Sequence, residues 1–172
     1  MARTFCFLFV ALAIASIGGG CTPALDWKRV EPETGGFSCE MPGDPKVGSQ
    51  QVNTPIGPIK VVTYTVALPN REYRIGSTPI PPNSPVLTTA QRLDGARDGA
   101  VRASSGTLLG EKKIKLGSCD GREFLIEKSG IYAHQRVFVV EKRIIQAQAG
   151  STSSEQDADI IRFFDSMKLL EK

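Results

Sequence analysis

The residues that could serve as nucleophile and base are few in this chain. His134 is the only histidine, and Cys39 and Cys119 are the only cysteines after residue 21. Nucleophilic catalysis needs an activated serine or cysteine with a base within reach. Cys119, which stands beside Asp120, and His134 are the one Cys/His pair to consider, and no motif flanks either residue. We therefore expect no catalytic residues and no enzymatic activity.

Metal and cofactor sites are not indicated either. The chain has neither the CxxC spacing nor the HExxH motif of zinc sites, and it has no GxxxxGK[ST] loop for phosphates. Asp94 and Asp98 lie one helical turn apart and could hold a cation, but Arg97 and Arg102 are spaced to pair with them. We expect a salt-bridged helix surface there, with no metal and no cofactor.

A strand pattern over 131–140 places several polar and aromatic side chains on one face. This face holds Tyr132, His134, Arg136 and Phe138. One interpretation is a binding surface that offers an aromatic ring, a titratable group and a guanidinium. The other is a sheet face beneath a helix, with Arg136 buried against a carboxylate such as Glu123 or Glu127.

Residues 1–20 have the pattern of a secretory signal. Arg3 is the only charge, an apolar run of thirteen residues follows over 5–17, and three glycines precede Cys21. Thirteen helical residues span about 20 Å, which is less than the roughly 30 Å of a hydrocarbon core. We therefore predict a cleaved signal peptide over 1–20 and an exported protein.

Cys21 follows the apolar run directly, as the lipidated cysteine of a lipoprotein signal does. Gly19 and Gly20 suit the small positions before it, whereas Gly18 stands where an apolar residue is usual. Cleavage after residue 20 removes Arg3 and lowers the formal net charge from +3 to +2, too little to hold a protein on a lipid surface. We expect a lipid anchor on Cys21 that faces the periplasm or the exterior; the alternative is ordinary cleavage nearby.

Charge and cysteine content bear on two further questions, a nucleic-acid partner and a disulfide bond. The 21 basic residues are interspersed with 18 acidic ones, so no stripe of positive charge predicts a nucleic-acid partner. An oxidising compartment would allow Cys39 and Cys119 to form a disulfide that closes a loop of about 80 residues. The alternative is two half-buried thiols that do not meet.

The rest of the chain predicts a tether and one domain. The tether covers 21–35, with Trp27 against the domain edge, and the domain covers 36–172. Alternating and β-branched runs predict strands over 37–41, 46–54, 59–68, 72–78, 112–117, 122–128, 131–140 and 143–150. Helical periodicity predicts helices over 87–104 and near 158–169, the second with a capping box of Ser153 and Gln156. This order gives an α+β fold with a mostly antiparallel sheet.

Two glycines stand inside the first predicted helix. Gly95 and Gly99 each cost a helix about 1 kcal/mol relative to alanine. Close approach of this helix to the sheet would offset that cost.

Several segments, taken in order, resemble a known family. They are FSCEMPGDP, TPIGPIKVVTYTVAL, LDGARDGAV, GEKKIKLGSCDGREFLIE, RVFVVEKRIIQAQ and DADIIRFFDSMKL. This order is similar to that of exported bacterial domains with the PsbP-like (PsbP/Mog-type) fold, over roughly residues 36–170. The resemblance implies an α/β/α sandwich around an antiparallel sheet, and the better-known relatives are non-catalytic protein-binding or accessory subunits. Family members commonly have proline where this chain has Cys119, which favours a local role for the thiol.

Two functions follow as expectations. The first is a non-enzymatic, membrane-tethered interaction or accessory domain with a protein partner. The second is an exported lipoprotein that binds a small ligand or ion between its sheet and a helix.

Overall fold

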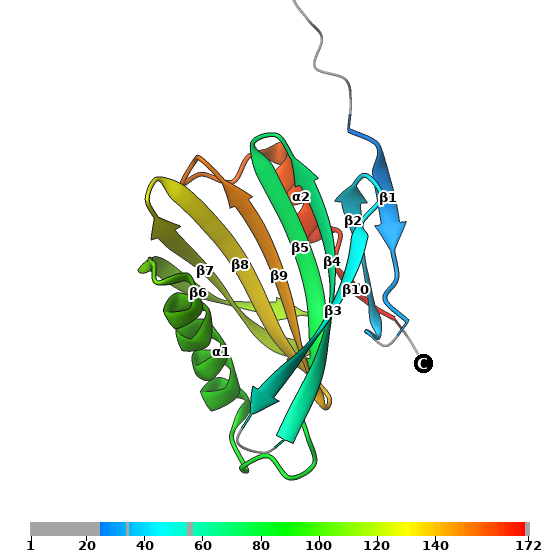
Figure 1. Cartoon of the computed structure of the whole chain (residues 1–172), viewed down its shortest axis with the longest axis vertical. Coiled ribbons are helices and arrows are strands. Elements are labelled where there is room, and N and C mark those ends of the chain that lie inside the picture. The colour runs from blue at the N-terminus through cyan, green and yellow to red at the C-terminus, as the bar shows by residue number, and fades with distance from the viewer. Residues whose placement is uncertain (1–24, 34, 55–56, 171–172) are drawn as a thin grey trace, which may run out of the picture.

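The centre of the structure, a computed structural model, is a seven-stranded antiparallel sheet (Figure 1). The structure describes residues 25–33, 35–54 and 57–170, so the expected signal peptide and Cys21 lie outside the described residues. In spatial order the strands are β3 (Lys46–Thr54), β4 (Gly57–Leu68), β5 (Arg71–Pro79), β9 (Arg143–Ser151), β8 (Ile131–Val140), β7 (Cys119–Lys128) and β6 (Thr107–Leu116). The strands predicted over 46–54 and 59–68 form a hairpin, β3 and β4, and β6 to β9 pair in chain order as an antiparallel meander.

A second layer covers one face of this sheet. It contains helix α2 (Ala158–Asp165) and a small sheet of β1 (Trp27–Val30), β2 (Phe37–Pro42) and β10 (Lys168–Leu169). The buried cluster between the layers includes Phe37, Met41, Tyr73, Phe138, Ile145, Ile160, Phe163 and Phe164.

In the described part of the chain, neither helix combines the length and the apolar composition that a membrane-spanning helix needs.

Helix α1 (Thr89–Ser104) covers part of the opposite face. Its Leu93 is buried with Phe124, Ile126 and Val137 in a second cluster. Val137 and Phe138 are consecutive in β8 and enter different clusters, because successive side chains of a strand point to opposite faces. The two helices therefore flank the sheet from opposite sides, and the predicted α+β fold is confirmed (Figure 1).

Helix α1 begins and ends within two residues of the prediction. The Thr88 side chain accepts a hydrogen bond from the backbone N–H of Gln91, and the Gln91 side chain accepts one from the backbone N–H of Thr88. Ser105, at a φ of 53°, ends the helix in the left-handed region. The helical periodicity of 87–104 predicts a stripe that includes Leu93, Ala96 and Ala100, and these three residues do pack in one cluster.

The start of helix α2 corrects one prediction. The N-cap is Asp157, whose side chain accepts hydrogen bonds from the backbone N–H groups of Asp159 and Ile160, both at 3.1 Å. Ser153 and Gln156 do not form the predicted capping box, because residues 152–157 first cross the end of the sheet as a loop. There the Gln156 side chain donates to Glu123 instead.

The predicted tether of residues 21–35 is also corrected. Residues Trp27–Val30 form strand β1, which pairs with β2. Trp27 docks on the domain as expected: its ring meets Tyr73 edge-on at 6.2 Å, and the Arg162 guanidinium lies 4.6 Å from the ring centre. The folded part of the chain therefore begins before residue 36.

The prediction that helix α1 approaches the sheet closely at Gly95 and Gly99 is wrong. A Cβ atom added to Gly95 or to Gly99 would meet no atom within 4 Å. Helix α1 reaches the sheet through Leu93, Ala96 and Ala100 instead. The helix therefore carries the cost of both glycines without a packing reason.

Replacing either helical glycine should stabilise the protein. We expect Gly95→Ala and Gly99→Ala each to raise the free energy of unfolding by about 1 kcal/mol, because alanine has the higher helix propensity and the added methyl has free space. Urea unfolding measures the change. Gly76→Ala is the control that should destabilise, since its Cβ would lie 2.6 Å from the carbonyl oxygen of Val62. A loss of stability in both helix variants would show that the added methyl groups do not have free space.

Candidate functional site

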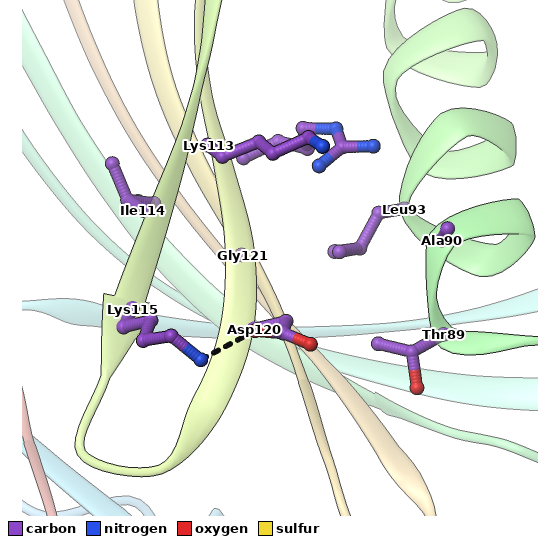
Figure 2. A pocket seen from close by; sticks show the side chains of 9 residues that line it. Thr89, Ala90, Leu93, Lys113, Ile114, Lys115, Asp120 and Gly121 are labelled. Atoms are coloured by element: carbon purple, nitrogen blue, oxygen red, sulfur yellow. Dashed lines mark hydrogen bonds and ion pairs between the residues drawn. The ribbon is translucent and has the colours of Figure 1, made fainter.

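A groove opens between the first turn of α1 and the tip of the β6–β7 hairpin (Figure 2). Its volume is about 500 Å³. The helix contributes Thr89, Ala90 and Leu93 to its wall. The two strands contribute Lys113, Ile114, Lys115, Asp120, Gly121 and Arg122.

Positive charge predominates in this groove. Lys113 of β6 lies directly opposite Arg122 of β7 in the strand register, and Lys115 lies opposite Asp120, with which it forms an ion pair at 2.8 Å. Figure 2 shows the Lys113 side chain extending toward the space between the hairpin and the helix. Like charges on directly opposed residues destabilise a sheet, and here the carboxylates that pair with Arg122 offset the repulsion.

Carboxylates behind the groove hold Arg122 in place. Its Nε lies 2.7 Å from Glu111 and its Nη2 lies 3.2 Å from Asp94 of α1. Arg97 joins the same group through Glu111, at 2.6 Å, and through Asp98, at 2.8 Å. The predicted salt-bridged surface of α1 is therefore confirmed for Arg97, which pairs with Asp94 and Asp98, whereas Arg102 forms no ion pair within the described residues. Arg122 from the sheet is an additional partner of Asp94. In the described ranges, no cluster of His, Cys, Asp and Glu could hold a metal ion.

The predicted face of Tyr132, His134 and Arg136 lies on the side of the sheet that α2 covers. Arg136 donates from Nε to Glu123 at 2.6 Å and from Nη1 to Asp165 of α2 at 2.9 Å. Its guanidinium also lies 4.8 Å from the centre of the Phe164 ring. This arrangement matches the second interpretation, a sheet face beneath a helix with Arg136 against a carboxylate.

Glu123 is the centre of this polar cluster. It is 7 % exposed, and its carboxylate also accepts hydrogen bonds from Lys112 at 2.8 Å and from Gln156 at 3.1 Å. Burial alone would raise the pKa of Glu123, but the hydrogen bonds from Lys112 and Arg136 outweigh it and lower the pKa. The cluster therefore keeps a charged carboxylate beneath the loop that leads into α2.

His134 lies in the same region and lines a small cavity of about 210 Å³ together with Glu123 and Gln156. The side chain is 3 % exposed, and Nε2 lies 3.2 Å from the backbone oxygen of Ser153. Burial lowers the pKa of His134 below its ordinary value of 6.5, although the contact with Ser153 opposes this shift. His134 thus holds the loop after β9 against the sheet as a neutral imidazole.

The two cysteines of the domain are free thiols. Cys39 is buried in β2, and burial raises its pKa to about 12, so its thiol is unreactive at neutral pH. Cys119 is half-buried at the start of β7. The structure therefore shows the second alternative, two thiols that do not meet.

The strand register keeps Cys119 and His134 apart. His134 of β8 lies opposite Leu125 of β7, six residues along the strand from Cys119. At about 3.3 Å per residue the two side chains are separated by roughly 20 Å. The one Cys/His pair considered from the sequence is therefore not brought together.

The alternation in 112–117 predicts Ile114 and Leu116 as inward residues and Lys113 and Lys115 as outward ones, and the structure confirms that Ile114 and Leu116 pack against the core. This pattern did not identify the groove. The only signal in the sequence is the short connection between β6 and β7, which sets Lys113 opposite Arg122. The contribution of α1 to the wall depends on how the helix packs, which no local pattern encodes.

The antiparallel sheet with helices on both sides places the chain in one class of fold, the PsbP-like fold. A cyanobacterial PsbP (CyanoP) from Synechocystis sp. PCC 6803 matches with a TM-score of 0.57 and 11 % identity, over 91 % of this chain and 98 % of that one. A protein of unknown function from Pseudomonas aeruginosa, PA94, matches with a TM-score of 0.37 and 11 % identity, over 78 % of this chain and 85 % of that one. No protein-family model and no curated protein sequence matches the chain.

The buried histidine should make stability depend on pH. Because the pKa of His134 is lower in the folded protein than in the unfolded chain, its neutral form favours folding at neutral pH, and this contribution is lost as the pH falls through 6.5. We expect the free energy of unfolding to fall less between pH 7.5 and pH 5.5 in His134→Gln than in the wild type. Urea unfolding at both pH values measures this. An equal loss in both proteins would show that His134 is not the titrating group.

Proposed function

We propose that this protein is an exported, membrane-attached accessory domain that binds another protein and catalyses no reaction. The observation that carries the proposal is the fold shared with cyanobacterial PsbP, which covers 91 % of this chain and 98 % of that one. The match extends over nearly the whole of both chains, so the shared fold is that of the entire domain.

Three further observations support the proposal. The nucleophile and base that the sequence offers lie roughly 20 Å apart along neighbouring strands. The buried Glu123 and its partner Arg136 join the sheet to α2 and are therefore part of the scaffold. The leader over 1–20 and Cys21 account for export and for attachment through a lipid.

Attachment through Cys21 is tested on the mature protein. We expect mass spectrometry to find a lipid-modified N-terminal Cys21, and Cys21→Ser to move the protein from the membrane fraction to the soluble fraction. One or two acyl chains supply the membrane affinity that a charge of +2 does not. Cys119→Ser is the matched control and should stay with the membrane. An unmodified N-terminus at or after Cys21 would refute the anchor.

The same preparation tests the accessory role. The wild-type protein, solubilised from membranes in mild detergent, should co-purify with one protein in a fixed stoichiometric ratio. The Cys119→Ser protein should retain that partner, because this thiol has no part in the proposed role. Recovery of the protein alone, with the anchor intact, would contradict the accessory function and leave the attachment standing.

The groove supports a second candidate function, the binding of a small anion. The specific observation is that Lys113 and Arg122, directly opposite each other, both line a groove of about 500 Å³. A bound carboxylate or phosphate would make charge-assisted hydrogen bonds with Lys113, while Arg122 stays paired with Glu111 and Asp94. The groove contains Asp120 as its only carboxylate, and Lys115 neutralises that group.

Anion binding is measured by thermal and urea unfolding in the presence of inorganic phosphate, sulfate or citrate. An anion present at 100 times its dissociation constant should stabilise the protein by about 2.7 kcal/mol. Lys113→Gln should remove most of this effect, whereas Lys46→Gln, an exposed lysine of β3 outside the groove, should not. Equal stabilisation of both variants would exclude the groove as the binding site.

A further inference from the structure

The two edge strands of the central sheet differ in how they are protected from pairing with another chain. One edge is β6, whose register with β7 shifts between Leu108 and Gly110. Four charged residues follow this bulge on the same strand: Glu111, Lys112, Lys113 and Lys115. Bulges and lysines are the usual means by which proteins prevent an edge strand from pairing with another chain.

The other edge, β3, has none of these protections. It runs for nine residues in continuous register with β4, contains no proline, and carries one charge, Lys46, at its first residue. Residues 46–51 are all exposed, and Val47 is 63 % exposed. In the sheets of the described chain, β4 is the only strand that pairs with β3. Its outward N–H and C=O groups are therefore available to a further strand.

We propose that β3 is an interaction surface for a second copy of this chain, which adds its own β3 in antiparallel orientation. Such a contact is symmetric, since the same residues serve on both sides, and it joins the two seven-stranded sheets into one. Each copy thereby covers the exposed β3 edge of the other.

The charges of β3 suit this pairing. In a register centred on Gln50, Gln50 faces Gln50 of the second copy and Ser49 faces Gln51, so the centre is neutral. Each Lys46 then faces Thr54 at an outer end of the paired strands, far from the other Lys46. The same pairing of β6 strands would bring the lysines of both copies together, which destabilises a sheet.

The dimer is expected to be reversible. One pair of edge strands buries less than the 1,200 Å² or so of a standard stable interface, so the dimer should form and dissociate with protein concentration. Confinement to a membrane surface would raise the local concentration of the chains, but the pairing itself does not depend on an anchor.

A charge-exchange experiment tests the pairing. Native mass spectrometry of the full chain in mild detergent, at increasing concentration, should show monomers and dimers of the wild type. Gln50→Lys and Gln50→Glu each place like charges at the dimer centre, so each should raise the dissociation constant about fivefold or more. An equal mixture of the two variants should restore dimers, as heterodimers with one copy of each.

Gln146→Lys is the matched control. Gln146 is exposed on β9, in the interior of the sheet, so this variant should dimerise as the wild type does. A wild type that remains monomeric at all concentrations would overturn the proposal. Dimers that persist in both Gln50 variants, or a mixture that forms no heterodimer, would overturn it as well. Circular dichroism and urea unfolding show whether each variant is folded.

Discussion

Burial of the aromatic face of α2 is the constraint on which the arrangement depends. Phe163 is fully buried and meets the Tyr73 ring at 5.3 Å, while Phe164 lies against both Phe163 and the Arg136 guanidinium. An eight-residue helix is too short to be stable alone, so its order depends on this contact. The contact in turn makes one face of the sheet an interior surface and brings β10 to β2.

Once that face is interior, its polar residues become part of the scaffold. Glu123 is buried and Arg136 largely so, and the pair is part of a wider set of contacts with Lys112, Gln156 and Asp165. The loop from Ser153 to Gln156 is held over the pair by His134 and Glu123. The two surfaces that we propose for binding, the groove beside α1 and the β3 edge, lie away from this covered face.

The sequence predicted the elements well, because the signals for them are local. Alternation located β8 at Ile131–Val140, and the helical stripe of Leu93, Ala96 and Ala100 located α1. The same local reasoning failed at the start of α2, where Ser153 and Gln156 have the spacing of a capping box and Asp157 is the N-cap. The spacing did not show that residues 152–157 are drawn over the sheet by His134 and Glu123.

The sequence by itself determined the fold class and the expectation of export with attachment at Cys21, because these depend on periodicity and on a contiguous apolar leader. It also placed Arg136 on a face with His134, but it left open whether that face was covered. Only the tertiary structure decided this, since covering depends on where α2 returns to the sheet. The groove and the free β3 edge were decided in the same way, by strand order and helix packing across the whole chain.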